Sequence, residues 1–196
     1  DPGMHSSQNE QDSRHYAIAS KIPMLEPSDL REAKEFVKIA FELSEQFDTP
    51  VLLRMCTRIA HSQCSVELCD PVNPVKKEYI KNPQKFIMAP ANAIRRHPVV
   101  EERTLKLIEL AETNEINKTE NGTDKSIGII TSGTAYQYVK EVVGDRYPVL
   151  KLGLVNPLPV ELIKSFAKEV QRVIVIEELD PVIENHCKAM GIEVEG

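Results

Sequence analysis

The residues that first suggest chemistry form a polar stretch near the start of the chain, "MHSSQNEQDSRHY" at positions 4–16. Amide, hydroxyl and imidazole side chains at the start of a helix are suited to hold a polar cofactor or a substrate carboxylate, because a helix N-terminus favours negative charge. The composition alone leaves a plain solvated helix start as an equal alternative. The candidate residues are His5, Ser6, Ser7, Gln8, Asn9 and Gln11.

Two residues of this stretch also fit a purely structural pattern. Ser7 and Glu10 form the S-x-x-E spacing of a capping box, in which each side chain satisfies an amide of the first helical turn. The pattern predicts a helix that begins inside the opening stretch and runs to about Ser20. It explains these two residues without any function, but it does not explain the other amide side chains of the cluster.

The turn "TSGT" (131–134) is a second candidate, because it follows a predicted strand and precedes a predicted helix. Its small residues would let backbone amides approach an anion at the helix N-terminus. The turn lacks the glycine patterns of dinucleotide-binding and P-loop proteins, so simple helix capping is the alternative.

Charged side chains follow other predicted strands. Glu177 and Glu178, with Asp180, could serve acid-base chemistry or bind a metal, although acidic residues at a strand end are commonly turn formers. Arg54 and Arg58 follow an earlier strand, where an arginine can hold a substrate carboxylate through two hydrogen bonds. Ion pairing with a nearby glutamate is the alternative for both arginines.

The cysteine pattern predicts free thiols and no metal site. The four cysteines at 56, 64, 69 and 187 are too few and too irregular for a disulfide scaffold. Cys64 and Cys69, with Cys56 and His61 nearby, could suggest zinc. A structural zinc site, however, is usually built from two closely spaced cysteine pairs, and a second pair is lacking here.

Composition limits the class of protein. The 196 residues carry a formal net charge of −6 and are 41% hydrophobic, which allows one sizeable core or two small ones. The acidic balance argues against nucleic-acid or anionic-membrane binding, and the sequence has no apolar run of the ~20 residues that a membrane span needs. We expect a cytoplasmic protein. Because the chain starts at Asp1 and Met4 leads straight into a polar cluster, we also expect an internal piece of a longer protein.

Strand and helix patterns of the first half predict an α/β unit. "IPMLEPS" indicates a short buried strand, and Ser28 or Asp29 can cap a following helix with apolar residues at three- and four-residue spacing. "PVLLRM" (50–55) is again of strand length, which favours a parallel pair. Residues 56–98 contain many prolines and indicate a surface excursion, and a helix is expected over 99–112.

The polar segment 112–126 is the expected linker between two units. After it, strands are predicted in "SIGIIT", "PVLKLGLV" and "RVIVIEE", alternating with helices over 135–143 and 159–170. This alternation predicts a parallel sheet covered by helices on both faces, with ligands beyond the carboxyl ends of the strands. Ser132, Asn156 and Glu177 lie at such ends.

Longer motifs resemble a known family. They closely resemble the large (alpha) subunit of indolepyruvate ferredoxin oxidoreductases, in this order along nearly the whole chain. That family oxidatively decarboxylates arylpyruvates to aryl-acetyl-CoA with thiamine diphosphate and Mg2+, and passes electrons through 4Fe-4S clusters to ferredoxin. The motifs are "DPGMHSSQNEQDSRHYA", "PMLEPSD", "FELSEQFDTPVLLR", "TR-x-x-HS", "TSGTAYQYVKE", "LKLGLVNPLPVELI" and "VIVIEELDPVIE".

This resemblance implies an architecture and a site. Residues 1–111 would be the latter part of a pyrimidine-binding domain, and 127–196 a transketolase C-terminal-like domain. A small (beta) subunit, ferredoxin, the arylpyruvate and coenzyme A would be partners. The glutamate that activates the aminopyrimidine would lie upstream of Asp1, and the Mg-diphosphate domain and cluster cysteines downstream of Gly196. His5 and Asn9 would be catalytic, and cofactor or substrate would be bound by Ser6, Ser7, Gln8, Gln11 and Arg54.

Two alternatives stay open at this point. The chain could belong to another 2-oxoacid ferredoxin oxidoreductase or to a transketolase-like thiamine enzyme. It could also be a non-catalytic module for subunit contacts. The segment "RMCTRIAHSQC" departs from the threonine-rich form expected of the family, with Cys56 in place of a hydroxyl residue, which leaves the role of that turn open.

Overall fold

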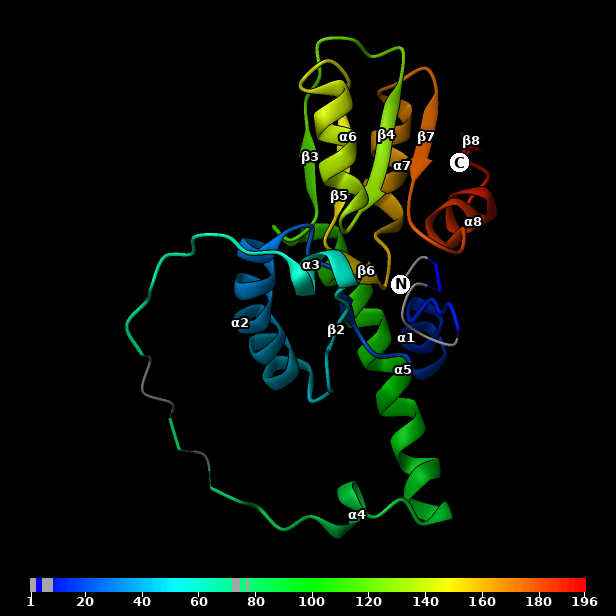
Figure 1. The fold of residues 1–196 in the computed structure, drawn as a ribbon. Coiled ribbons are helices and arrows are strands. Elements are labelled where there is room, and N and C mark those ends of the chain that lie inside the picture. Colours follow the sequence, from blue (N-terminus) through cyan, green and yellow to red (C-terminus); the bar gives the residue numbers. More distant parts are fainter. Residues whose placement is uncertain (1–2, 5–8, 72–74, 77) are drawn as a thin grey trace.

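The structure is a computed structural model that describes residues 3–4, 9–71, 75–76 and 78–196. Within these residues the chain is α/β, as predicted, and its strands form a three-stranded and a five-stranded sheet (Figure 1). None of the helices in this part of the chain is long and apolar enough to cross a membrane.

The first sheet contains the predicted strand, helix and strand. β1 (Met24–Leu25) and β2 (Leu52–Leu53) pair in parallel, and α2 (Leu30–Phe47) connects them. The side chain of Asp29 caps α2 by accepting a hydrogen bond from the Glu32 amide at 2.8 Å. On the apolar face of α2, Phe36 and Leu43 are buried against Leu25, Ala111 and Leu154.

α1 (Arg14–Ser20) begins later than the capping box predicted. Glu10 lies outside any helix and accepts a hydrogen bond from the Gly3 amide instead. Ser7 lies outside the described residues. The capping-box prediction is therefore wrong for Glu10, because a tertiary contact in the loop has replaced the local one.

The helix predicted over 99–112 is longer than expected. α5 spans Pro90–Thr113 and contains Pro98 in its interior, which removes one backbone hydrogen bond. Arg96 and Arg103, on either side of Pro98, both reach Asp48 at the end of α2, at 3.6 Å and 2.8 Å. The proline therefore does not end the helix, and Leu107 and Ala111 further along it are buried in the fold.

Between β2 and α5 the chain makes the predicted surface excursion. Only α3 (Thr57–His61) and α4 (Pro83–Phe86) are regular in the described part of this region. Figure 1 shows the described residues beyond α3 swinging away from α2 before they return to α5.

The segment 112–126 is more ordered than a flexible linker. It contains β3 (Lys118–Glu120), which pairs antiparallel with β5 (Val149–Leu152). The buried Asn117 accepts hydrogen bonds from the amides of Gly153 and Leu154, both at 3.0 Å. The division into two units at this segment stays a prediction.

Limited proteolysis is expected to begin in the excursion and not in the segment 112–126. Trypsin should cut first at Lys81, which is exposed and outside any helix or strand, because cleavage needs a locally unfolded backbone. Cleavage at Lys118 should be slow, since β3 is hydrogen-bonded to β5. Mass spectrometry of the earliest fragments tests this order, and a first cut at Lys118 would contradict it.

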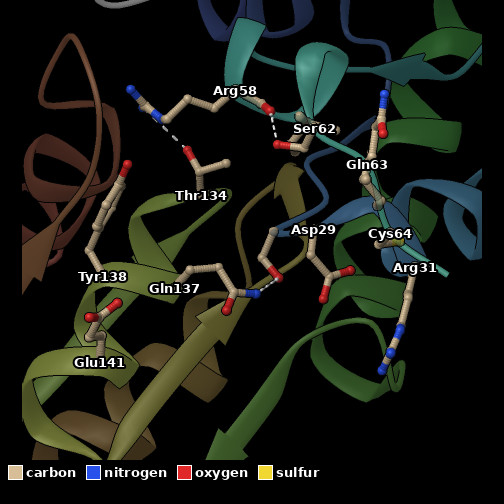
Figure 2. Close-up of a pocket in the computed structure, with 13 residues that line it drawn as sticks. Asp29, Arg31, Arg58, Ser62, Gln63, Cys64, Thr134, Gln137, Tyr138 and Glu141 are labelled. Carbon is tan, nitrogen blue, oxygen red and sulfur yellow. Dashed lines mark hydrogen bonds between the residues drawn. The ribbon is translucent and has the colours of Figure 1, made fainter.

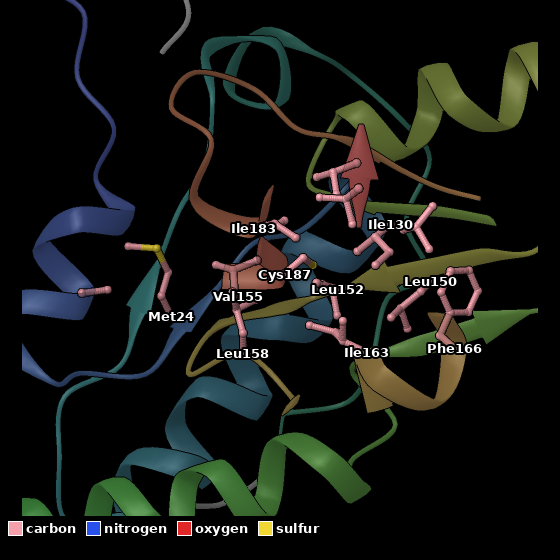
Figure 3. Packing of buried hydrophobic residues seen from close by; sticks show 14 residues of the cluster. Met24, Ile130, Leu150, Leu152, Val155, Leu158, Ile163, Phe166, Ile183 and Cys187 are labelled. Carbon is pink, nitrogen blue, oxygen red and sulfur yellow. The ribbon is translucent and has the colours of Figure 1, made fainter. Parts of the chain in front are cut away.

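The second sheet has the strand order β3-β5-β4-β7-β8. All neighbours are parallel except β3 and β5, so the predicted parallel sheet is confirmed with an antiparallel edge strand. Apolar clusters lie on both faces, one against α7 and α8 and the other against α6, and Figure 3 shows the larger cluster. The bounds of these elements are β4 (Gly128–Ser132), α6 (Ala135–Val143), α7 (Val160–Lys168), β7 (Val173–Ile176), α8 (Val182–Ala189) and β8 (Val194–Glu195).

The strand predicted in "PVLKLGLV" is divided between the two sheets. β5 belongs to the five-stranded sheet, whereas β6 (Leu154–Asn156) pairs antiparallel with β1. Gly153 lies at the break, where a Cβ atom would stand 2.7 Å from the Ile116 carbonyl oxygen and 2.9 Å from the Phe36 ring. The absence of a side chain at Gly153 therefore allows the chain to pass from one sheet to the other.

Candidate functional site

Polar side chains from both sheets meet where strands end. Glu26 follows β1, Arg54 follows β2, Ser132 is the last residue of β4, and Glu177 and Glu178 follow β7. Although the sequence placed these groups far apart, the fold gathers them with the start of α1. Of the residues that the sequence placed at strand ends, Ser132 and Glu177 belong to this cluster, and the expectation that ligands bind there stays a prediction.

Arg54 forms a buried ion pair at the centre of this cluster. Its Nη1 donates to the Glu26 carboxylate, and its Nε lies 4.0 Å from Asp12 Oδ1. Glu26 also accepts a hydrogen bond from Ser132 Oγ at 3.0 Å. Of the two possibilities for Arg54, the structure therefore shows ion pairing with a glutamate. Its predicted grip on a substrate carboxylate stays a proposal.

The "TSGT" turn packs closely against a carboxylate of the protein itself. Gly133 has a φ of 53°, and a Cβ atom at this position would lie 2.5 Å from Glu26 Oε1. Thr134 precedes α6 without capping it, and its hydroxyl donates to Glu178 Oε1 at 3.1 Å. The anion nearest to this turn is therefore supplied by the protein.

Arg58 connects α3 to this turn. Its guanidinium pairs with the Glu178 carboxylate and donates to Thr134 Oγ1 at 3.4 Å. It also lies over the ring of Tyr138, 5.7 Å from the centroid, within the range of a cation-π contact. Cys56 Sγ lies 3.6 Å from Thr134 Oγ1, so the residue that departs from the family pattern contacts the same turn.

A pocket of about 450 Å³ opens beside this turn (Figure 2). In Figure 2, Gln137 and Tyr138 come from α6, Thr134 immediately precedes it, and Arg58 faces them from α3. Gln137 donates to Ser28 Oγ at 3.2 Å, which joins the wall of α6 to the start of α2. The lining residues are Ser28, Asp29, Leu30, Arg31, Arg58, Ile59, Ser62, Gln63, Cys64, Thr134, Gln137, Tyr138 and Glu141.

The carboxylate of Glu177 contacts backbone amides and an arginine of the protein itself. It accepts hydrogen bonds from the amides of Ile183 and Glu184, both at 3.0 Å, at the start of α8, and it pairs with Arg14. Asp180 Oδ2 lies 2.7 Å from His15 Nε2, with both side chains largely exposed. These contacts agree with the turn-forming alternative for the acidic residues.

The opening polar cluster is only partly within the described residues. His5, Ser6, Ser7 and Gln8 lie outside them. Asn9 and Gln11 are exposed on the segment that leads into α1, and Asp12 is buried just after them.

The sequence predicts free thiols and no metal site, and the described residues contain one group of possible metal ligands. Asp12, His15 and Asp180 are the group there whose possible ligand atoms lie within 4.8 Å of one another, but both Asp12 oxygens accept hydrogen bonds from Arg14. No cysteine of the described residues belongs to such a group. Burial raises the pKa of the Cys187 thiol to about 11, as expected for an inert core cysteine.

Asp12, Arg14 and Glu26 were absent from the residues predicted to form the site. Glu26 immediately follows a predicted strand, so its position offered a signal of the same kind as that of Arg54. Arg14 offered none, because its partner Glu177 is 163 positions away along the chain.

Sequence comparison finds relatives along nearly the whole chain. The indolepyruvate oxidoreductase subunit IorA of Archaeoglobus fulgidus is 42% identical over 98% of this chain and 32% of that subunit. The IorA subunits of Methanothermobacter thermautotrophicus and Pyrococcus horikoshii are 42% and 39% identical, over 97% and 98% of this chain and 32% and 31% of theirs. No protein-family model matches the chain.

Structure comparison gives a consistent fold. A structure of the 2-oxoglutarate:ferredoxin oxidoreductase from Magnetococcus marinus, with 2-oxoglutarate, coenzyme A and succinyl-CoA bound, matches 92% of this chain and 40% of that one. The TM-score is 0.61 at 16% identity, so this likeness concerns the fold alone. As its sequence motifs predicted, the chain is a relative of the indolepyruvate oxidoreductase subunits IorA and spans about one third of their length.

Proposed function

We propose that this chain forms part of a thiamine-diphosphate-dependent indolepyruvate:ferredoxin oxidoreductase. The complete enzyme would oxidatively decarboxylate arylpyruvates to aryl-acetyl-CoA and pass the electrons to ferredoxin. A small (beta) subunit, ferredoxin, coenzyme A and the arylpyruvate would be its partners. A cytoplasmic location stays a prediction.

One observation carries this proposal. Identity of 39–42% to IorA subunits extends over 97–98% of the chain, including both sheets and the polar cluster between them. The fold likeness to the 2-oxoglutarate:ferredoxin oxidoreductase from Magnetococcus marinus shows that the fold of the chain is compatible with this proposal. Because the chain spans about one third of the IorA relatives, the rest of the catalytic machinery is expected in other parts of the complete protein.

The two buried carboxylates of the polar cluster, Asp12 and Glu26, do not by themselves fit the cofactors that the proposed reaction needs. Arg14 occupies both oxygens of Asp12, and Glu26 is held by Arg54 and Ser132. Neither carboxylate is therefore placed to receive Mg2+ or an aminopyrimidine ring. We propose that thiamine diphosphate, Mg2+ and the 4Fe-4S clusters are bound mainly by other parts of the protein. His5 and Asn9 would act at the edge of the site, and Ser6, Ser7, Gln8, Gln11 and Arg54 would help to bind cofactor or substrate.

The proposal is tested with the full-length complex and three substrates. Reduction of ferredoxin is measured with indolepyruvate, pyruvate and 2-oxoglutarate, each with coenzyme A. The specificity constant kcat/KM is expected to be highest for indolepyruvate. Preferred oxidation of pyruvate or 2-oxoglutarate would indicate a different 2-oxoacid enzyme, and lack of activity with all three would favour a module for subunit contacts.

The isolated 196-residue chain is expected to bind thiamine diphosphate poorly. The two buried carboxylates of the cluster, Asp12 and Glu26, are already paired with Arg14 and Arg54, so they are not offered to the Mg2+ that accompanies the diphosphate. Calorimetry with Mg2+ and thiamine diphosphate measures this directly, and the full-length complex is the control. Micromolar binding to the isolated chain would show that the cofactor site lies within it.

A further inference from the structure

Arg14 is a buried cation at the first position of α1. Only 1% of its surface is exposed. Its Nε donates to both carboxylate oxygens of Asp12 at 3.0 Å, and its Nη2 donates to Asp12 Oδ2 at 2.6 Å. Through this bidentate pairing, Arg14 holds Asp12, which lies two residues before the first residue of the helix.

The same guanidinium holds the loop that follows β7. Its Nη1 pairs with the Glu177 carboxylate, and its Nη2 donates to the carbonyl oxygens of Glu178 and Asp180 at 2.7 Å and 2.8 Å. The amide of Asp180 in turn donates to Asp12 Oδ2 at 3.3 Å. One side chain therefore joins two segments that are more than 160 positions apart in the sequence.

The loop after β7 is itself held in place by hydrogen bonds and an ion pair. Glu177 is fixed by the two amides at the start of α8, and Glu178 is fixed by Thr134 and Arg58. Leu179, which follows Glu178, has a φ of 73°, a conformation that a leucine adopts only when its surroundings impose it. A side chain anchored to this loop is therefore anchored to the second sheet.

The buried charges of Asp12 and Arg14 are each stabilised by groups of opposite charge. Burial alone raises the pKa of Asp12, but the hydrogen bonds and charge of Arg14 outweigh it, so that the pKa lies below its ordinary value. Burial alone lowers the pKa of Arg14, and the surrounding carboxylates raise it above its ordinary value. A buried ion pair contributes little more stability than apolar residues of the same volume would. The position that Arg14 imposes on the two segments therefore explains a buried arginine here better than a gain in stability does.

We propose that Arg14 is a positioning residue, which holds the segment entering α1, and with it Asn9 and Gln11, against the loop after β7. The second sheet would thereby set the orientation of a segment that the proposed function places at the edge of the active site. This inference rests on the proposed function for its catalytic consequence, but not for the position of the segment.

The test uses three variants of the full-length complex. Arg14→Lys keeps the charge but removes the planar fork that binds Asp12 and the loop together. Glu177→Gln is the second variant, because it keeps the side-chain volume and one of the two acceptors for the α8 amides while removing the charge that pairs with Arg14. Ile163→Ala, within α7, is the control for lost stability, since Ile163 is fully buried in the core but takes no part in the hydrogen bonds and ion pairs of Arg14.

Two measurements are made well below the melting temperature of each variant. We expect Arg14→Lys to lower kcat for indolepyruvate by about tenfold to a hundredfold, because small misplacements of orienting groups are costly. Ile163→Ala should lower the melting temperature but leave kcat close to that of the wild type. Hydrogen exchange should be faster at residues 9–13 in Arg14→Lys and Glu177→Gln, and unchanged there in Ile163→Ala.

Each outcome decides the proposal. If kcat falls in Arg14→Lys only as much as in Ile163→Ala, or if exchange at residues 9–13 does not change, Arg14 has no positioning role. If the wild-type complex does not oxidise indolepyruvate, the proposed function fails instead. The exchange measurement then still decides whether Arg14 holds the segment.

Discussion

Replacement of Asn9 by alanine in the full-length complex is expected to lower the rate of arylpyruvate oxidation by roughly tenfold to a thousandfold. Asn9 is exposed on the segment that leads into α1, so its side chain adds little to the core. An amide in this place can orient a cofactor or substrate through hydrogen bonds. The measurement is kcat and KM for indolepyruvate with ferredoxin as the acceptor.

The matched control is Asn121→Ala, which removes the same side chain from an exposed loop beside β3. We expect this variant to keep the kcat and KM of the wild type. Equal kinetic constants in Asn9→Ala and Asn121→Ala would contradict a catalytic role for Asn9.

His5→Ala is expected to show a loss of the same size as Asn9→Ala. The residue lies outside the described part of the chain, so this expectation depends on the polar stretch and on the resemblance to the family. If the imidazole transfers a proton, the pH dependence of kcat should change in His5→Ala and stay unchanged in Asn9→Ala. Wild-type kinetics in His5→Ala at all pH values would contradict the prediction.

Arg54→Met is expected to destabilise the region between the two sheets by about 3 to 5 kcal/mol. The substitution leaves the Glu26 carboxylate buried without its cationic partner, with Ser132 as its remaining neutral donor. Hydrogen exchange of the β4 amides in the full-length protein measures the local free energy of opening.

Two further variants separate the charge effect from packing. The double variant Arg54→Met with Glu26→Gln should recover part of the loss, because the unpaired charge is then removed. Arg172→Met breaks an ion pair with Glu195 whose side chains are 57% and 63% exposed, and it should leave the free energy of opening close to that of the wild type, because water screens an exposed pair. A loss in Arg54→Met as small as that in Arg172→Met would show that the buried pair contributes little.

The elements that the sequence predicted well depend on neighbouring residues. α2 has its cap at Asp29 and its apolar stripe within the same 18 residues, and α6 spans the predicted 135–143. The strands β1, β4 and β7 are short apolar runs between turn formers. In each case the favourable contacts are close along the chain, so the pattern of residue types is enough to predict the element.

The errors occurred where distant residues decide the local conformation. α1 starts at Arg14, whose side chain contacts the loop after β7, and α5 continues through Pro98, with Arg96 and Arg103 both reaching Asp48. The break at Gly153 depends on Ile116 and Phe36, which close the space where a side chain would stand. Local propensity is a weak preference, and tertiary contacts override it.

The candidate site divides in the same way. The sequence by itself identified the polar opening stretch, the "TSGT" turn, the two arginines and the acidic strand end, because each lies at the end of a predictable element. Only the tertiary structure decided that Arg54 pairs with Glu26, that Arg58 pairs with Glu178, and that Arg14 joins α1 to the second sheet. Burial makes an unpaired charge costly, so each buried charge must have a partner, but which partner it finds depends on how the sheets are packed together.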